Sequence, residues 1–450
     1  MAQAGTPAII GSHAENDRLA VSGPLPTGPI GRGSPLYGRL RAALFLAGFA
    51  TFALLYCVQP LLTMFGDAFH VSPAAASLSL SLSTGLLAFS IIGTTPLAVR
   101  FGRKRLMGAS MLLAALCNIA CAESPGWTAL LALRAVEGVL LGGVPAVAMA
   151  HLAEEVAPAD LGAAMGLYVG GTAFGGMAGR VGTALVIAQD GRHDAWRLGL
   201  AITGLACLAA GLAFLALLPP SRAERGWAGP RRPGPADNAT SRQAGSGWIW
   251  HLRDPGMWAL FLTGFLAMSA FVCTYNYLGF RLARPPFSLG QAGSGAVFLV
   301  YLFGIVASPV AGRLSARFGP GPVLISGPCF GLAGLALTLL PSLLAVMAGL
   351  ALVTIGFFVS HSVASAWVGS RATRDRGHAA ALYLLAYYVG SSIMGTVGGW
   401  FWSRGAWPGV AWFGAALLAI ALGTALAMSV LTVARPARQQ NPDRQREAAG

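Results

Sequence analysis

Long apolar stretches constrain this chain more than any other feature. Twelve of them, each close to the length of a membrane-spanning helix, lie between Leu40 and about Val433. A helix of ~20 apolar residues crosses the ~30 Å hydrocarbon core of a bilayer. Inside lipid, backbone polar groups must be hydrogen-bonded within their own segment. The sequence therefore predicts an all-α integral membrane protein with twelve transmembrane helices.

The composition agrees with this interpretation. Hydrophobic residues make up 55% of the chain and charged residues 10%, too few to cover a water-soluble surface. All six cysteines lie inside apolar stretches, so we expect no disulfide framework. The predicted spans are 40–64, 75–98, 106–122, 127–151, 161–187, 197–218, 256–280, 289–311, 321–340, 343–366, 378–402 and 409–433.

The basic residues are unevenly distributed. A net charge of +14 is compatible with nucleic-acid binding, but most Lys and Arg residues lie in the two tails and in the loops after spans 2, 6, 8 and 10. The loops on the opposite side carry few. This is the positive-inside bias of membrane proteins, so we predict that both termini are cytoplasmic and that no nucleic acid binds.

The chain contains an internal repeat at a shift of about 215 residues. Leu44–Phe49 matches Leu260–Phe265, Arg100–Gly102 matches Arg317–Gly319, and Leu167-Tyr168 matches Leu382-Tyr383. The repeat predicts two pseudo-symmetric six-helix bundles with a substrate site between them. We expect a disordered tail over 1–39, bundles over 40–218 and 256–433, a cytoplasmic linker over 219–255, and a tail over 434–450.

Two short loops carry a turn glycine among cations. The loop after span 2 contains Arg100, Gly102, Arg103 and Lys104, and the loop after span 8 contains Gly312, Arg317 and Gly319. Both resemble the loop signature of the major facilitator superfamily, in which glycine permits a tight turn and cations hold the helix ends. The acidic residue that is usual in this signature is replaced by Val99 and Ala316. A plain positive-inside loop is the alternative interpretation.

Span 4 contains an embedded charge pair. Arg134 lies three residues before Glu137, on the same helix face, and Glu137 is the only carboxylate well inside any predicted span. A guanidinium near the bilayer centre costs about 2.5–3.5 kcal/mol and needs a partner. The motif is similar to the superfamily's Arg-x-x-Gln-Gly signature, with Glu137 in place of glutamine. We hypothesise that Glu137 carries a proton and that Arg134 tunes it. The alternative is a permanent structural pair.

Span 5 is rich in glycine. Gly171, Gly175 and Gly179 recur at spacings of four, which permits close helix packing and bending. They resemble the superfamily's antiporter signature, although Gly176 replaces its proline and Arg180 its last glycine. Simple close packing is the alternative. Arg180 is a second embedded cation, which attracts an anionic group or extends to the membrane interface.

Polar and aromatic residues are candidates for a substrate cavity. They are Gln59, Arg180, Tyr275, Asn276, Tyr383 and Tyr387. Aromatic faces accept cations and flat apolar ligands. His361 is a candidate second proton site, because its ordinary pKa lies near neutrality. For each residue alone, ordinary packing is the alternative. Gln59-Pro60 predicts a kink in span 1.

Several stretches resemble the YnfM-like, or acriflavine-sensitivity, branch of the superfamily. They are Phe49–Leu62, Leu167–Arg180, Gly356–Gly369 and Leu382–Trp402. The resemblance implies a twelve-helix transporter in the bacterial inner membrane whose export of small molecules is driven by protons. The sequence lacks a phosphate-binding loop, a metal-ligand cluster and a catalytic triad, so we expect no enzyme activity, no cofactor and no metal.

Our main hypothesis is a proton-coupled efflux antiporter of small amphipathic compounds, such as drugs, dyes, sugars or other metabolites, that acts as a monomer by alternating access. Its partners are then the lipid bilayer, protons and a small-molecule substrate. A symporter that imports a sugar or organic acid is the first alternative. A non-transporting membrane sensor is the second.

Overall fold

The computed structural model describes residues 28–222, 225, 247–372 and 375–433, and within these ranges the chain is helical apart from short connections. An isolated bridge joins Ile30 to Val156. The predictions for residues 1–27, 226–246 and 434–450 lie outside the described residues.

The first half of the chain forms the helices that carry spans 1 to 6. They are α1 (Pro35–Tyr56), η1 (Gln59–Leu61), α2 (Leu62–Phe69), α3 (Pro73–Phe101), α4 (Arg103–Ala122), α5 (Trp127–Leu141), α6 (Pro145–Glu155), α7 (Pro158–Asp190) and α8 (Ala195–Leu217).

The second half forms the corresponding helices of spans 7 to 12. They are α9 (Gly247–Arg253), α10 (Pro255–Leu282), α11 (Gln291–Ala296), η3 (Val297–Val300), α12 (Tyr301–Phe318), α13 (Pro320–Thr338), α14 (Leu343–Arg371) and α15 (Arg376–Val433).

The described residues contain twelve transmembrane crossings. Ten helical segments are long and apolar enough to cross a membrane. The last of these contains two helices, because α15 is kinked through non-helical backbone at Gly405 and Ala406. Helix α7, with 33 residues, is not among these ten segments but is also long enough to cross, at 1.5 Å per residue. It crosses beside α1, with which it packs closely.

Three predicted spans are interrupted, which corrects the uninterrupted helices expected from hydropathy. Span 1 breaks into a 3-10 turn at Gln59–Leu61, where the kink was predicted. Span 4 breaks after Leu141, because Gly142 and Gly143 precede Pro145, which lacks the backbone N–H that a helix interior needs. Span 8 passes through the 3-10 turn Val297–Val300.

The ends of several elements also differ from the sequence prediction. Helix α1 begins at Pro35, inside the predicted tail 1–39, because the Ser34 hydroxyl accepts a hydrogen bond from the Leu36 backbone N–H and proline suits the first helical turn. Ile30, which is 1% exposed, is packed into the core. The short helix Gly247–Arg253 lies within the predicted linker 219–255.

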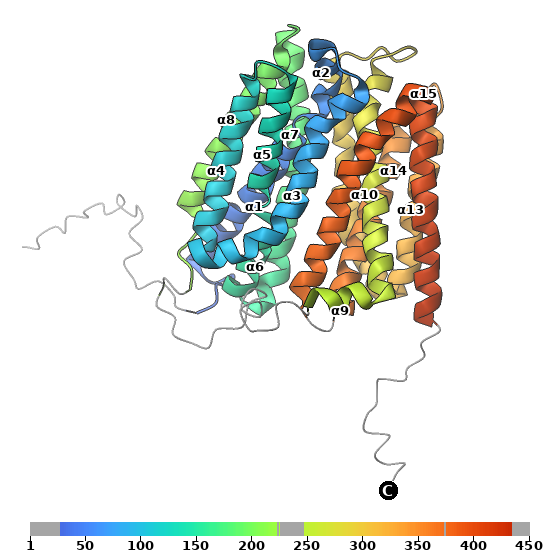
Figure 1. Cartoon of the computed structure of the whole chain (residues 1–450). Coiled ribbons are helices and arrows are strands. Elements are labelled where there is room, and N and C mark those ends of the chain that lie inside the picture. The colour runs from blue at the N-terminus through green and yellow to red at the C-terminus, as the bar shows by residue number, and fades with distance from the viewer. Residues whose placement is uncertain (1–27, 223–224, 226–246, 373–374, 434–450) are drawn as a thin grey trace, which may run out of the picture.

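The helices form two groups that repeat the same packing (Figure 1). The blue-to-green helices α1 to α8 lie on one side and the yellow-to-red helices α10 to α15 on the other. A Cβ atom added to Gly175 would overlap the carbonyl oxygen of Phe49, and one added to Gly390 would overlap that of Phe265. Since these pairs correspond at the repeat shift, the same close helix approach occurs in both halves.

The two groups touch each other near the end where α2 lies. The Ser392 hydroxyl donates to the Ser81 carbonyl at 2.7 Å, and the Thr396 hydroxyl donates to the Ser81 hydroxyl at 2.8 Å. Helix α1 begins and α15 ends at the opposite end (Figure 1). The halves are therefore closed against each other at one end of the molecule.

The two glycine loops have the same backbone conformation. Gly102 has φ of 83° and Gly319 has φ of 84°, and each connects two helices directly. Non-glycine residues are disfavoured at such angles because their Cβ approaches the carbonyl oxygen. The repeat therefore extends to the turn geometry.

Replacing Gly102 with alanine is expected to destabilise the protein by about 1–2 kcal/mol, because nothing lies within 4 Å of the added Cβ and only the backbone strain remains. The check is thermal unfolding of the purified protein. Gly126→Ala is the matched control, since Gly126 has φ of −170° and the same free space. Equal unfolding midpoints for the two variants would contradict the strain.

Candidate functional site

A buried charge pair lies in the core of the first half. Arg134 and Glu137 on α5 are both 0% exposed, and Nη1 of Arg134 donates to Oε2 of Glu137 at 2.6 Å. Within the described part of the chain, Oε1 of Glu137 has no hydrogen-bond partner. The pair is enclosed by protein and does not face an open cavity.

Arg134 also connects three helices. Its Nε donates to the Ser79 carbonyl of α3 at 2.9 Å, Nη1 to the Leu54 carbonyl at 3.2 Å and Nη2 to the Leu55 carbonyl at 2.9 Å. Leu54 and Leu55 lie in the last turn of α1, just before the break in span 1. The Arg134 side chain therefore satisfies carbonyl groups at the place where α1 ends.

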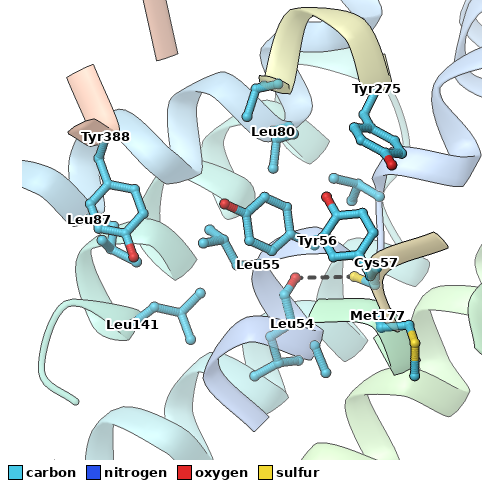
Figure 2. Close-up of a cluster of buried hydrophobic side chains, with 14 of the residues drawn as sticks. Leu54, Leu55, Tyr56, Cys57, Leu80, Leu87, Leu141, Met177, Tyr275 and Tyr388 are labelled. Atoms are coloured by element: carbon cyan, nitrogen blue, oxygen red, sulfur yellow. Dashed lines mark hydrogen bonds between the residues drawn. The ribbon is translucent and has the colours of Figure 1, made fainter. Parts of the chain in front are cut away.

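The end of α1 lies between this pair and the residues that join the two halves. Figure 2 shows Leu54, Leu55, Tyr56 and Cys57 side by side, with the Cys57 thiol donating to the Leu54 carbonyl at 3.2 Å. Tyr56 follows directly on the two residues that Arg134 holds. Its ring packs against the guanidinium of Arg180, 3.9 Å from the ring centre.

Arg180 on α7 lies in an aromatic cluster formed by both halves. It is 1% exposed, and its guanidinium also lies 4.6 Å from the Tyr301 ring and 5.5 Å from the Phe298 ring. Its Nε donates to Oε1 of Gln59 at 2.5 Å, and its Nη1 donates to the Gly176 carbonyl at 2.6 Å. Cation–π contacts and hydrogen bonds together offset the loss of water around this cation.

The Gln59 side chain, which accepts from Arg180, also connects it to the second half. Its Nε2 donates to Oδ1 of Asn276 on α10 at 2.6 Å. The hydroxyl of Tyr275, the residue before Asn276, donates to the Thr354 hydroxyl at 2.7 Å, because the Thr354 hydroxyl donates to the Leu350 carbonyl. The Tyr275 ring packs on Tyr301. Arg180, Gln59 and Asn276 thus form one polar chain between the halves.

A second aromatic cluster surrounds His361 on α14. Nδ1 of His361 lies 3.0 Å from the Tyr383 hydroxyl, and the ring contacts Tyr387 at 4.8 Å between centres. Phe357 stacks on His361 and, at 3.9 Å, on Phe271. Because Phe271 also contacts Tyr301, aromatic rings connect the His361 cluster to the Arg180 cluster.

The structure therefore gathers the six predicted cavity residues into two connected clusters, one that joins the halves around Arg180 and one formed by second-half residues around His361. The hydroxyls of Tyr56, Tyr387 and Tyr388 make no hydrogen bond to another group within the described residues. Such an arrangement offers flat apolar surfaces, hydroxyl donors and one cation to a small molecule. The predicted proton residues are separated, with Arg134 and Glu137 in the first half and His361 in the second.

The predicted glycines of α7 lie against α1. A Cβ on Gly171 would come within 2.5 Å of the Phe45 carbonyl oxygen, and one on Gly179 within 2.6 Å of the Ala53 carbonyl oxygen. Together with Gly175 they let two backbones touch, the usual role of small residues in membrane helix contacts.

The basic loop residues lie at the end of the molecule where α1 begins and α15 ends, and two of them bind residues at helix ends. Arg103 forms a two-pronged ion pair with Glu154, and Nζ of Lys104 donates to the Leu218 carbonyl at 2.7 Å. Arg100 and Arg317 each lie over the phenylalanine that follows them. Gly312 has open space around its α-carbon.

The second half has an ion pair at a different place, which the sequence analysis did not predict. Nε and Nη2 of Arg371 each donate to the carboxylate of Asp254 at 2.7 Å. This hydrogen-bonded guanidinium holds the pKa of the Asp254 carboxyl below its usual value. The pair connects the end of α14 to the start of α10.

Sequence reasoning also missed Tyr56, Tyr301 and the serines of α3. Ser77, Ser79, Ser81 and Ser83 are all at most 2% exposed. Their alternation with leucine distributes them over two helix faces, so Ser83 donates to the Arg134 carbonyl while Ser81 contacts α15. The run Ser77–Thr84 was a usable signal, because hydroxyls within a membrane span usually face protein.

No cluster of three or more His, Cys, Asp or Glu side chains suited to a metal ion occurs in the described ranges.

Comparison with known proteins identifies the family. The family model described as Major Facilitator Superfamily matches residues 44–296 and 286–450. This chain belongs to the major facilitator superfamily. It is 42% identical over 412 residues to the inner membrane transport protein YnfM of Escherichia coli, which covers 91% of this chain and 94% of that protein. It is also 42% identical over 393 residues to the uncharacterized MFS-type transporter YybF of Bacillus subtilis, with 87% and 94% coverage.

Solved structures of the superfamily have the same fold. A bacterial homologue of the human lysosomal transporter Spinster, in an inward-facing and unoccupied conformation, matches with a TM-score of 0.67 at 16% identity, covering 89% of this chain and 96% of that one. The nucleoside transporter NupG matches with a TM-score of 0.68 at 13% identity, covering 86% and 98%. The prediction of an all-α superfamily fold is confirmed. The protein is a multi-pass membrane transporter and not an enzyme.

Proposed function

We propose that this transporter is a proton-coupled efflux antiporter of small amphipathic compounds in the bacterial inner membrane, acting as a monomer with both termini in the cytoplasm. The observation that carries the proposal is the enclosed Arg134–Glu137 pair, because a carboxylate inside the membrane core is costly and is a functional group by default. Similarity to the inner membrane transport protein YnfM supports the location.

Proton binding at Glu137 is coupled through Arg134 and the end of α1 to the residues between the halves. Protonation weakens the ion pair with Arg134, whose other hydrogen bonds hold the Leu54 and Leu55 carbonyls. The next residue, Tyr56, packs on Arg180 between the halves. A shift of Arg134 therefore moves the end of α1 and the aromatic wall together. His361, hydrogen-bonded to Tyr383, is the proposed second proton site.

Alternating access requires the closed end to open. With both termini cytoplasmic, the contacts of Ser81 with Ser392 and Thr396 close the outer side. Proton entry from outside would follow the breaking of these contacts, and the glycine contacts between α1 and α7 would allow the helices to slide.

The test separates exchange from gradient-driven transport in proteoliposomes. Glu137→Gln retains the side-chain oxygen that accepts from Arg134 but cannot release a proton. We expect this variant to exchange substrate between the two sides as fast as wild type, yet to lose accumulation driven by a pH gradient. Accumulation at the wild-type level by Glu137→Gln would overturn the role of Glu137.

Symport of an organic acid is the second candidate, and Arg180 is the observation that favours it. Within the described residues, Arg180 is the charged side chain in the aromatic clusters, and a cation suits an anionic solute. The direction of proton movement on adding solute distinguishes uptake from efflux.

A further inference from the structure

We infer that the transported compound is an organic anion, an aromatic or apolar body carrying a carboxylate that Arg180 binds. This inference deepens the proposed function and rests on transport through the space between the halves. Its basis is the charge balance of that space, which is independent of the direction of proton movement.

Within the residues that the structure describes, the guanidinium of Arg180 has no anionic partner. Its described hydrogen bonds are to neutral groups, the Gln59 amide and the Gly176 carbonyl, and its other contacts are aromatic faces. Arg134, by contrast, is neutralised by Glu137. A cation that is 1% exposed and lacks a counter-charge is held at a cost that an anionic ligand would reduce.

The Arg180 side chain also has hydrogen-bonding capacity left. Its hydrogen bonds use Nε and Nη1, and its Nη2 donates to no group within the described residues. The neighbouring Tyr301 hydroxyl is buried and has no hydrogen-bond partner among the described residues. A carboxylate oxygen accepts from both kinds of donor, and hydrogen bonds to a charged group are stronger than neutral ones.

Aromatic surface next to these donors suits the body of such a ligand. Tyr301 contacts Phe271, which stacks on Phe357 beside His361. No carboxylate side chain contacts these rings in the described part of the molecule, so a cationic dye would find no counter-ion there. An inside-negative membrane potential also drives an anion outward, at about 2.3 kcal/mol per charge and 100 mV, which suits export.

The experiment compares three ligands with the same ring system: 1-naphthoate, 1-naphthamide and 1-naphthylmethylamine. Binding to the full-length protein in nanodiscs is measured by equilibrium dialysis, with empty nanodiscs as the blank. We expect 1-naphthoate to bind at least about tenfold more tightly than the amine. Arg180→Gln is expected to abolish this preference, and Arg180→Lys to retain part of it, because lysine keeps the charge but loses the planar fork.

Arg404→Gln is the matched control, because it removes one positive charge at an exposed residue whose guanidinium lies over Trp400. It should bind like wild type. A wild-type preference for the amine, or unchanged naphthoate binding by Arg180→Gln, would overturn the inference. If a variant fails to fold, the comparison of the three ligands on the wild-type protein still tests it. Because binding needs no gradient, anion binding without proton exchange would reject the proposed proton coupling but not the anionic substrate. Proton-coupled export of the amine would reject the anionic substrate but not the proton coupling.

Discussion

Arg134→Met is expected to destabilise the protein by about 3–5 kcal/mol and to abolish the recovery of folded transporter. The substitution leaves Glu137 in the core without a counter-charge and removes the donors to the Leu54, Leu55 and Ser79 carbonyls. Breaking one partner of a buried ion pair is costly because the remaining charge is uncompensated. Size-exclusion profiles and thermal unfolding of the purified protein are the measurements.

Glu137→Gln is the control for the Arg134 substitution. It keeps an oxygen for Nη1 of Arg134 and leaves the three carbonyl contacts in place, but it removes the counter-charge of Arg134, so its unfolding midpoint should fall by less than that of Arg134→Met. If Arg134→Met were as stable as Glu137→Gln, the pair would not organise the end of α1, and the proposed route from Glu137 to Tyr56 would fail.

Gly175→Leu is expected to have the second large effect, a loss of about 3 kcal/mol or more. A Cβ at this position overlaps the Phe49 carbonyl oxygen, which is backbone and cannot rotate away. The two helices α1 and α7 would have to separate along their whole glycine contact. Thermal unfolding and the yield of folded protein provide the measurement.

The same substitution at Gly170 is the matched control. Gly170 lies on the same helix α7, but nothing lies within 4 Å of its added Cβ. Gly170→Leu should therefore unfold near the wild-type midpoint. Similar losses for both variants would mean that α7 disfavours leucine for reasons other than contact with α1.

Hydrophobicity and internal repetition predicted most of the fold. The twelve apolar stretches were enough to predict the helices, because an apolar stretch of this length crosses a bilayer as a helix. The sequence matches around Gly48 and Gly264 predicted that the two halves pack in the same way. In the structure Gly48 faces the Tyr168 carbonyl and Gly264 faces the Tyr383 ring, at corresponding positions of the two halves. Hydropathy missed the breaks in spans 4 and 8, because local backbone geometry does not change average hydrophobicity.

The candidate site was only partly predictable. Arg134, Glu137 and Arg180 were evident, since charges within membrane spans are rare. Their surroundings were not, because Arg134 bonds to backbone carbonyls 79 and 80 residues away, which any sequence provides. Tyr301 contacts Arg180 only because the halves fold against each other, and nothing in the sequence near either residue indicates that contact.

Substrate-induced proton movement in inside-out membrane vesicles tests the central claim most directly. Vesicles with an acidified lumen are challenged with dyes, sugars and organic acids, and the lumenal pH is followed for wild type and Glu137→Gln. The account predicts proton release from the lumen on adding a substrate, and its loss in Glu137→Gln. Proton movement into the lumen together with the solute, or release that persists in Glu137→Gln, would contradict it.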